Sequence, residues 1–568
     1  MNLRAAIANS LWLALNLPAW ARFRRALNHP AETQTRLLRD HLARNADTEF
    51  GKAHGFAEIK NYEEFARRVP LNDYEDLTPW IKRIRRGENR VLTSGAVTHF
   101  IPTGGSSGAR KLIPFTRELQ REFNHAISAW IADLYRTHPS VVLGPAYWSI
   151  SPAIKIEDSE SSTVPIGFDD DTAYLGGTRR QLVDTIIAVP SELRLVSDME
   201  QFRYLTLLCL LRQQSLRLIS IWHPSFLSLL LDALPRYWED LLRDIESGVC
   251  RYVNLLPPTV IRSLKLHAMP ERARQLRNAN PADPKTIWPH LEIISCWGDG
   301  HAKLAKADLE RRFPAVFIES KGLLATECVV TIPFSNSFPL AIHSHFFEFV
   351  DEEGRVCLGH ELKENRIYEV VVTTGGGLWR YRLHDQIEVT GFVGLTPSLR
   401  FLGRAGNISD YCGEKLSEHF VAQAIHKAFG TSSPQFAMLA PDEGPLGLHY
   451  TLFVEGDVQS EVAARLDALL LQNPHYAWCR KSGQLGPLEL FWIRTAGYEL
   501  FVTREQSRGK RLGEIKPRSL SRETGWSQYF QGYPPADSAM LQNGLHGVCS
   551  RLPKLQNDEP AIFRPTSS

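Results

Sequence analysis

The segment 103–111 contains the residue types that bind a polyphosphate. Its nine residues, Thr-Gly-Gly-Ser-Ser-Gly-Ala-Arg-Lys, include three glycines, three hydroxyl side chains and two cations. Glycine lets backbone N–H groups approach a ligand closely, while hydroxyls and lysine add donors and positive charge. The flanks, 97–101 and 111–116, are predicted to be short strands that hold the loop. A flexible surface turn would have the same composition, so the loop alone does not decide between the two.

The loop does not have the phosphate-binding pattern of kinases and GTPases. That pattern requires Gly-x4-Gly-Lys-[Ser/Thr]. Counted from Gly104, the second glycine would be residue 109 and the lysine residue 110, but the chain has Ala109 and Arg110. If this loop binds a nucleotide, the protein is therefore not one of the kinases or GTPases that have this pattern.

Thr326 and Glu327 end the segment 315–327, which is predicted to be a strand with a polar end. Open α/β sheets bind ligands at the carboxyl ends of their strands. A glutamate at such a place can coordinate a phosphate-bound Mg²⁺, since Mg²⁺ prefers carboxylate and phosphate oxygens. A helix or turn cap is the alternative role for these residues.

Asp385 is predicted to lie just after a strand. The apolar, β-branched run 367–374 and the glycines 375–377 precede it, and Arg380 and Arg382 are predicted to share one strand face. An ionised carboxylate accepts hydrogen bonds through both oxygens, so Asp385 can hold two sugar hydroxyls. An isolated Asp after a strand is otherwise a turn residue.

Aromatic residues at two predicted strand ends are candidates for the wall of an organic-acid pocket: Tyr147, Trp148, Trp222 and His223. Ligand pockets are mostly apolar with a few polar groups, although aromatics beside proline also serve as core packing. His343 and His345 would share one strand face while Glu348 would point to the other, which disfavours a protein-bound zinc site.

The composition is that of a globular protein without a nucleic-acid-binding surface. The chain has 568 residues, 43% hydrophobic and 23% charged, with a net charge of +2. The eight cysteines have no metal-binding spacing, which favours a reducing cytoplasm. The apolar run 5–20 is interrupted by Asn9 and Asn16 and is too short to span a membrane, so a buried helix is predicted.

Helix-like and strand-like runs alternate through residues 204–234, which predicts an α/β architecture. A polar joint near residue 405 predicts a domain boundary, with a large domain over 1–404 and a small one over 405–568. In the small domain we expect helices over 417–429 and 459–472, a strand over 448–455 and a mobile basic loop over 504–512, before Lys516.

The order of the motifs resembles the adenylate-forming superfamily. The matching segments are 103–111, 323–327, 381–385 and Gly403-Arg404. With segments 346–349, 373–382 and 409–415, the chain is similar to the bacterial branch of the auxin-responsive Gretchen Hagen family of acyl-acid amido synthetases. The resemblance implies a large adenylate-forming domain of mixed sheets flanked by helices, and a smaller, mobile α+β C-terminal domain.

The resemblance also implies a two-step ligase reaction that uses ATP and Mg²⁺. A small carboxylic acid is adenylated with release of pyrophosphate, and an amine, typically of an amino acid, then displaces AMP. The implied phosphate-binding residues are Thr103, Ser106, Ser107, Gly108, Lys111 and, at the α-phosphate, Thr326. Glu327 would hold Mg²⁺ and Asp385 the ribose. Arg404 at the domain joint would reach the nucleotide, and Lys516 would enter the site for adenylation.

The chain departs from the family pattern at three positions. Leu323 replaces an aromatic residue, His384 replaces a glycine, and Gly104 replaces a hydroxyl residue. Two other functions remain open at this stage. One is an acid–thiol ligase that transfers the acyl group to coenzyme A or a carrier protein, and the other is a non-catalytic ligand-binding protein on the same fold.

Overall fold

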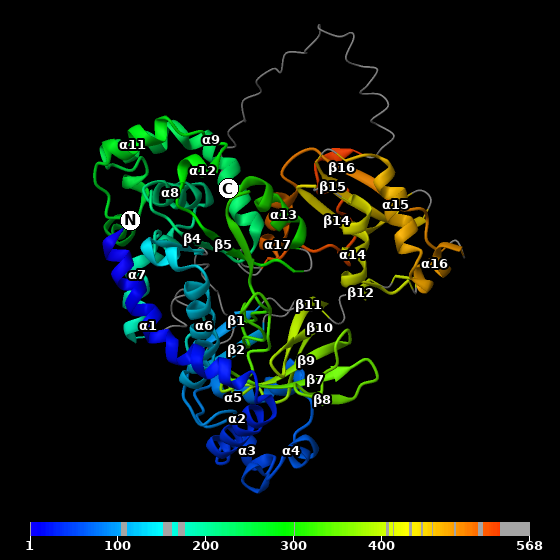
Figure 1. Cartoon of the computed structure of the whole chain (residues 1–568). Coiled ribbons are helices and arrows are strands. Elements are labelled where there is room, and N and C mark those ends of the chain that lie inside the picture. The colour runs from blue at the N-terminus through cyan, green and yellow to red at the C-terminus, as the bar shows by residue number, and fades with distance from the viewer. Residues whose placement is uncertain are drawn as a thin grey trace, which may run out of the picture.

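The structure is a computed structural model that describes most of the chain. The described residues are 2–103, 111–150, 162–167, 177–299, 302–404, 408–409, 411–412, 414–430, 434–444, 447–456, 458–481, 484–508 and 515–533. Figure 1 shows the N-terminal part, blue to light green, built from sheets and many helices, with the yellow-to-red C-terminal part beside its upper half. The N-terminal helices are α1 (Leu3–Ala26), α2 (Pro30–Asn45), α3 (Glu49–Ala53), α4 (Tyr62–Arg68), α5 (Tyr74–Arg85), α6 (Arg117–Thr137), α7 (Gly177–Ile186), α8 (Met199–Leu211), α9 (Pro224–Ser247), α10 (Pro258–Leu264), α11 (Pro270–Arg277), α12 (Pro284–Ile287) and α13 (Ala302–Arg312).

A four-stranded parallel sheet forms one half of the large N-terminal domain. Its strands, in spatial order, are β3 (Ala146–Trp148), β4 (Leu218–Ser220), β5 (Ile293–Cys296) and β6 (Phe317–Ser320). Residues of one face pack in a core with α1 and α6, and residues of the other face pack with α8 and α9. Helices on both faces explain the short, apolar strand sequences, because a parallel sheet is buried on both sides. The predicted α/β architecture is confirmed.

An antiparallel sheet of five strands forms the other half. Its order is β11 (Thr396–Arg404), β10 (Tyr381–Val393), β9 (Ile367–Thr373), β7 (Phe346–Asp351) and β8 (Val356–Leu358). A separate hairpin of β1 (Val97–Thr103) and β2 (Lys111–Thr116) pairs in antiparallel fashion, so the two flanking strands predicted for the loop are confirmed. Segments from the two halves share one large apolar core.

The smaller C-terminal domain has its own sheet and its own cores. Strands β14 (Phe436–Gly444), β15 (Gly447–Glu455), β16 (Glu489–Ile493) and β17 (Gly532–Tyr533) form the sheet, and β12 (Ile408–Ser409) pairs with β13 (Leu416–Ser417). The helices are α14 (Glu418–Phe429), α15 (Glu461–Leu470), α16 (Pro474–Lys481) and α17 (Gly497–Ser507). Its apolar residues pack on one another in two clusters that contain no residue before 412. The predicted strand and both predicted helices are confirmed.

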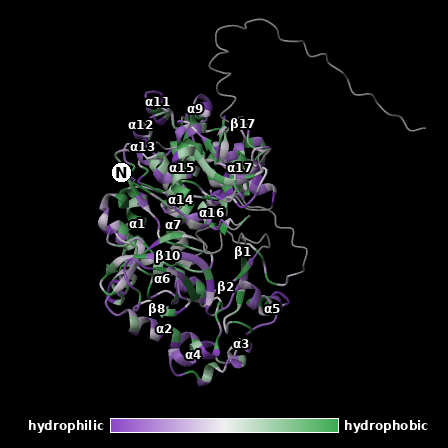
Figure 2. Cartoon of the chain, turned by 90° about the vertical axis from the view of Figure 1, so that its right-hand side faces the viewer, coloured by the Kyte–Doolittle hydropathy of each residue, from purple (hydrophilic) through white to green (hydrophobic). Residues whose placement is uncertain are grey.

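Helix α1 is buried along only one face. Trp12 and Phe23 are buried, but Leu3, Ile7, Leu11 and Leu15 are 48–65% exposed. The prediction of a buried helix is therefore correct for one face of α1 only. The sequence has apolar residues on other faces as well, and the neighbouring helices do not cover these. Within the described segments, no helix has the combined length and apolar character needed to cross a membrane. By contrast, α4 at the lower end of the molecule is largely hydrophilic (Figure 2), and its only buried residue is Phe65.

The structure differs from the sequence-based expectations at several places. Asp385 lies within β10, not after a strand, and Arg380 precedes that strand with a φ of 44°, so only Arg382 belongs to it. Residues 504–507 are the last residues of α17 instead of a loop. His343 and His345 lie in the turn before β7, not in a strand. The position of Asp385 differs because β10 pairs with β9 and β11 beyond the point where its local pattern ends.

Candidate active site

The β1–β2 hairpin positions the predicted phosphate loop. Thr103 and Lys111 are paired in the register, so they close the base of the loop from opposite strands. Ser106, Ser107 and Gly108 lie outside the described residues. The Lys111 ammonium donates to the Tyr381 hydroxyl across 3.3 Å and lies 5.5 Å from the centre of the Tyr74 ring. Lys111 is thus directed from the hairpin toward the first residue of β10.

Strand β10 carries both Tyr381 and Asp385. Asp385 is 8% exposed, and it pairs with Arg404 of β11 in the antiparallel register. The ladder therefore brings Asp385 next to the last residue of β11, just before the joint to the C-terminal domain. One strand holds the partner of Lys111 at its start and Asp385 four residues later.

His384, where the family resemblance would expect glycine, has a left-handed backbone conformation within β10. Its φ is 59°, in the left-handed region, and the ladder between β9 and β10 shifts register here. The ring nitrogens lie 2.9 Å from Asp73 and 3.1 Å from Glu369. Burial raises the pKa of Glu369, but hydrogen bonds from His384 and Arg382 outweigh it and lower the pKa to about 2. These contacts hold His384 in the conformation that its β-carbon disfavours.

The negative charges of Glu327 and Asp385 both act on the same buried thiol, that of Cys328. Thr326 and Glu327 are in the irregular segment after β6, and Glu327 is 6% exposed. Burial, followed by the negative charges of Glu327 and Asp385, raises the pKa of the Cys328 thiol well above its usual value. A carboxylate such as that of Glu327 is a ligand type that Mg²⁺ prefers. Leu323 is buried in the apolar core, which gives its side chain a packing role.

Lys516 reaches the large domain from the C-terminal domain. Its ammonium lies 3.7 Å from the centre of the Trp297 ring, which follows β5, and this ring stacks on Phe401 of β11 at 5.8 Å. Burial and then the charge of Lys516 lower the pKa of His223 to about 3. Lys516 therefore lies at the carboxyl ends of the parallel strands, and its charge acts on His223, one of the pocket candidates from the sequence.

A polar row crosses one face of the parallel sheet at these strand ends. The register pairs Trp148 with Ser220, Ser220 with Ser295, and Ser295 with Glu319, so their side chains point to the same face. Tyr147 points to the opposite face, where it is fully buried in the core with α8 and α9. The structure thus separates the two neighbouring aromatics that the sequence grouped together.

Lys321, which is buried, and Glu319, which is half-buried, add ionisable groups to the polar row. The Lys321 ammonium donates to the Ser220 hydroxyl across 2.8 Å and lies 4.8 Å from the Trp222 ring centre. The Trp130 indole N–H donates to Glu319 across 3.1 Å. Burial raises the pKa of Glu319 to about 7. The sequence analysis missed both residues; the polar triplet Glu-Ser-Lys at the end of an apolar strand was the signal that could have found them.

These features define a class of protein. A large domain of parallel and antiparallel sheets, followed by a small α+β domain whose lysine faces the strand ends, is the fold of the adenylate-forming ligases. Residues 19–316, 338–404 and 419–525 match the GH3 family N-terminal, central and C-terminal domains. The chain belongs to the GH3 family, as its resemblance to the Gretchen Hagen enzymes implied.

Named proteins of this family align along most of the chain. A probable indole-3-acetic acid-amido synthetase GH3.12 of Oryza sativa subsp. japonica is 26% identical, over 89% of this chain and 93% of its own. Indole-3-acetic acid-amido synthetase GH3.3 of Arabidopsis thaliana is 24% identical, over 86% of this chain and 89% of its own. The solved structure of AtGH3.15 acyl acid amido synthetase in complex with 2,4-DB superimposes with a TM-score of 0.78 at 20% identity, covering 89% of this chain and 94% of that one.

Proposed function

We propose that the protein is an acyl-acid amido synthetase. It activates a small carboxylic acid as its adenylate, using ATP, and transfers the acyl group to the amine of an amino acid, with release of pyrophosphate and AMP. Membership of the GH3 family over all three family domains supports this reaction class. One observation carries the proposal in particular: the Lys111 ammonium contacts Tyr381, the first residue of the strand that holds Asp385.

The roles proposed for these groups follow from the charge that the reaction develops. Attack on the α-phosphate increases negative charge on phosphate oxygens, which fixed donors and cations stabilise. Lys111, with Thr103, Ser106, Ser107 and Gly108 of the loop, would hold the phosphates, and Thr326 would contact the α-phosphate. Asp385 would accept from the ribose hydroxyls, and Arg404 would reach the nucleotide from the end of β11. Mg²⁺, held by Glu327, would neutralise phosphate charge when bound.

The acid and the amine would bind at the carboxyl ends of the parallel strands. Trp148 and Trp222, with His223 nearby, offer apolar surface, and Lys321 and Glu319 supply the few polar groups that orient a ligand in such a pocket. Lys321 can attract a carboxylate. Glu319, whose pKa burial raises to about 7, can accept a proton or hydrogen bond from the acceptor ammonium group.

Lys516 would act in the adenylation step. It lies beside Trp297 and influences His223, and both residues follow strands of the parallel sheet. We propose a division into domains 1–404 and 405–568, with rotation about the joint near residue 405 carrying Lys516 in and out between the two half-reactions. The separate cores on the two sides of the joint support such a motion.

We also propose a cellular location for the enzyme, its branch of the family and its partners. Among the described residues seven cysteines are free, which supports a cytoplasmic location. We also propose that the chain is a member of the bacterial branch of the family, which its motif order resembles. A small acid and an amino acid remain the proposed partners, and the near balance of charge gives no support for nucleic acid.

Pyrophosphate exchange and product mass together test the proposal. The protein is incubated with ATP, Mg²⁺, labelled pyrophosphate and a panel of acids, and acid-dependent labelling of ATP is expected. Free amino acids or coenzyme A are then added, and mass spectrometry is expected to find the amide and AMP. Formation of the thioester alone would identify an acid–thiol ligase, and absence of exchange with every acid would favour a binding protein. Lys363→Ala, in an exposed loop, is the control for Lys111→Ala.

A further inference from the structure

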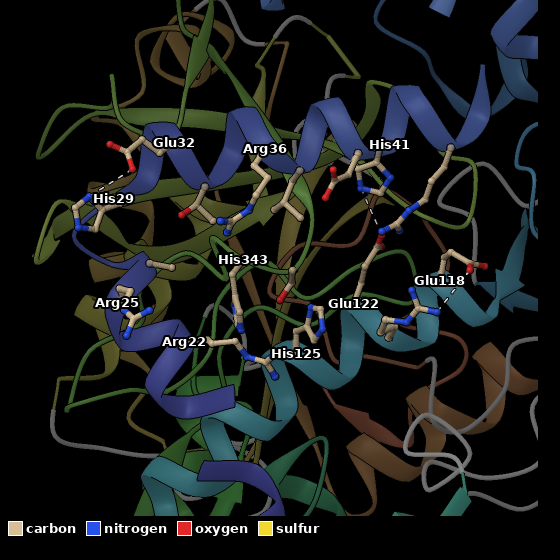
Figure 3. Close-up of a pocket in the computed structure, with 17 residues that line it drawn as sticks. Arg22, Arg25, His29, Glu32, Arg36, His41, Glu118, Glu122, His125 and His343 are labelled. Carbon is tan, nitrogen blue, oxygen red and sulfur yellow. Dashed lines mark ion pairs between the residues drawn. The ribbon is translucent and has the colours of Figure 1, made fainter. Parts of the chain in front are cut away.

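A pocket separate from the proposed nucleotide site opens between three helices of the large domain. It has a volume of about 610 Å³ and lies between the C-terminal end of α1, helix α2, the first half of α6 and the turn at 343–344. None of the residues proposed for ATP, Mg²⁺ or the substrates lines it. Figure 3 shows Arg36 of α2 and Arg22 of α1 extending toward His343 from two sides, with His125 of α6 beside them.

Positive charge is in excess around this pocket. The carboxylates of Glu32 and Glu118 lie 3.7 Å from His29 and Arg121, respectively. Four arginines that line the pocket make no ion pair with any described residue: Arg22, Arg25, Arg36 and Arg44. Besides Glu122, which is described below, the remaining acidic residue in the pocket lining is Asp40. Unpaired guanidinium groups that converge on a concave surface suit an anion with several oxygens, because each can bind two of them.

The remaining acid, Glu122, is already engaged inside the protein. Its carboxylate accepts from the His345 Nδ1–H at 2.9 Å and from the Gly375 N–H at 2.9 Å. The Val329 N–H donates to His345 Nε2, so the proton of this ring is on Nδ1 and points to Glu122. Burial acts to raise the pKa of Glu122, but the His345 hydrogen bond and the charge of His41 lower it overall. Glu122 is therefore satisfied without any of the arginines.

The floor of the pocket has polar groups without partners. Both ring nitrogens of His343 and the hydroxyl of Ser344 are shielded from solvent, and among the described residues they have no hydrogen-bond partner. Ser344 is 0% exposed. Unpaired buried donors are uncommon because each loses its hydrogen bonds to water without replacement. A ligand that carries acceptor oxygens would satisfy both residues from inside the pocket.

We infer that this pocket binds a small phosphate-bearing anion, gripped by Arg22 and Arg36 and hydrogen-bonded by His343 and Ser344. A phosphate group offers negative charge for the arginines and acceptor oxygens for the floor. The ligand is either free phosphate or a phosphate monoester whose remainder occupies the rest of the volume. This binding does not depend on the reaction proposed above.

The same site is connected to the proposed active site. Glu122 and Glu118 on α6 pack against Gly375: a β-carbon there would lie 2.6 Å from the Glu122 carboxylate oxygen. The hydroxyl of Thr116, which ends β2 and caps α6, donates to the Gly375 carbonyl across 2.9 Å. Lys111 begins the same strand. Helix α6 thus connects the pocket, through Gly375 and Thr116, to the strand that begins with Lys111.

Calorimetric titration of the full chain with inorganic phosphate, and separately with glycerol 3-phosphate, tests the inference. Both are expected to bind, and tighter binding of the ester would identify a phosphorylated metabolite as the ligand. Arg22→Ala/Arg36→Ala is expected to weaken binding by at least about tenfold, since each charge-assisted contact contributes strongly. Ser344→Ala should weaken it by a smaller factor. Arg39→Ala, an exposed arginine of α2 that does not line the pocket, is the matched control and should leave binding unchanged.

Three results would overturn the inference. Neither compound binds; both bind the double variant and the parent chain equally; or Lys111→Ala abolishes binding, which would place the phosphate in the nucleotide site. Circular dichroism verifies that the double variant is folded, as expected for exposed arginines. Glycerol is the neutral control and should not bind. Because binding is read without ATP or acid, failure of the amide synthetase proposal would not affect these outcomes.

Discussion

The Nδ1 atom of His384 lies 3.1 Å from the carboxylate of Glu369, across the β9–β10 ladder from it. Its other ring nitrogen lies 2.9 Å from Asp73, at the start of α5. The residue has a φ of 59°, and it immediately precedes Asp385. Contacts of the side chain thus hold His384 in a conformation that glycine adopts more readily, at the position directly before Asp385.

Replacement of His384 should distinguish strain from contact. In His384→Gly the left-handed strain is relieved but the carboxylate contacts are lost, so the free energy of unfolding should change by less than about 1 kcal/mol. In His384→Ala the strain stays and the contacts are lost, so stability should fall by about 1–3 kcal/mol. Urea unfolding measures both. Equal losses in the two variants would mean that the backbone is not strained.

Substitution of Lys111 should strongly reduce adenylation activity and have a smaller effect on the stability of the fold. Lys111→Met removes the cation proposed to stabilise phosphate charge, so acid-dependent pyrophosphate exchange should fall by about 100-fold or more. Tyr381→Phe removes only the hydroxyl that Lys111 contacts, and a loss of about tenfold is expected. If Lys111→Met retained full exchange activity, the hairpin would not be a phosphate site.

Lys516 should affect the two half-reactions unequally. Lys516→Ala should lower pyrophosphate exchange by about 100-fold, while amide formation from a synthetic acyl-adenylate should change by less than about threefold. Arg518→Ala, two residues away and paired with Glu505 at 2.9 Å, is the control for a general effect on this segment. An equal loss in both half-reactions would argue against a lysine that serves adenylation alone.

Glu319 should make stability depend on pH in a defined window. Its pKa is raised from 4.5 to about 7 in the fold, so the folded protein holds this proton more tightly than the unfolded chain. Stability should therefore fall as pH rises from about 4.5 to about 7, by up to about 3 kcal/mol. Glu319→Gln should remove this fall, which makes the variant more stable than the parent near pH 8 but not near pH 4.5. Urea unfolding at both pH values measures the free energy of unfolding of the parent and the variant. Glu352→Gln, at an exposed position, is the control.

The buried pair of Arg380 and Glu348 should be costly to break. Their side chains are 5% and 1% exposed and 2.7 Å apart, and Arg380 also donates to the carbonyls of Ala66 and Val69. Arg380→Met leaves the carboxylate buried without its partner, so a loss of about 3–5 kcal/mol is expected. Arg400 of β11 forms a more exposed pair with Glu388 of β10 in the same sheet. Arg400→Met should lower the free energy of unfolding by less than about 1 kcal/mol. Chemical denaturation compares the two, and equal costs would contradict the role of burial.

The local sequence predicted most of the helices and strands named above, but not which elements pack against or pair with one another. The strands β1 and β2 and helices α14 and α15 follow from β-branched runs, helical spacing and a capping serine, which act within a few residues. The strand that holds Asp385 could not be bounded in this way, because its pairing partners in β9 and β11 extend it through the position where the local pattern ends.

By itself, the sequence determined the order of the motifs, the class of fold and the groups proposed to handle ATP, since each motif is a short run of residue types. Only the tertiary structure decided that Glu319 and Lys321 join Ser220 in one polar row, that Tyr147 and Trp148 face opposite sides, and that arginines of α1 and α2 enclose a pocket with His343. Such relationships depend on strand register and helix packing between residues far apart in the chain, which no local pattern records.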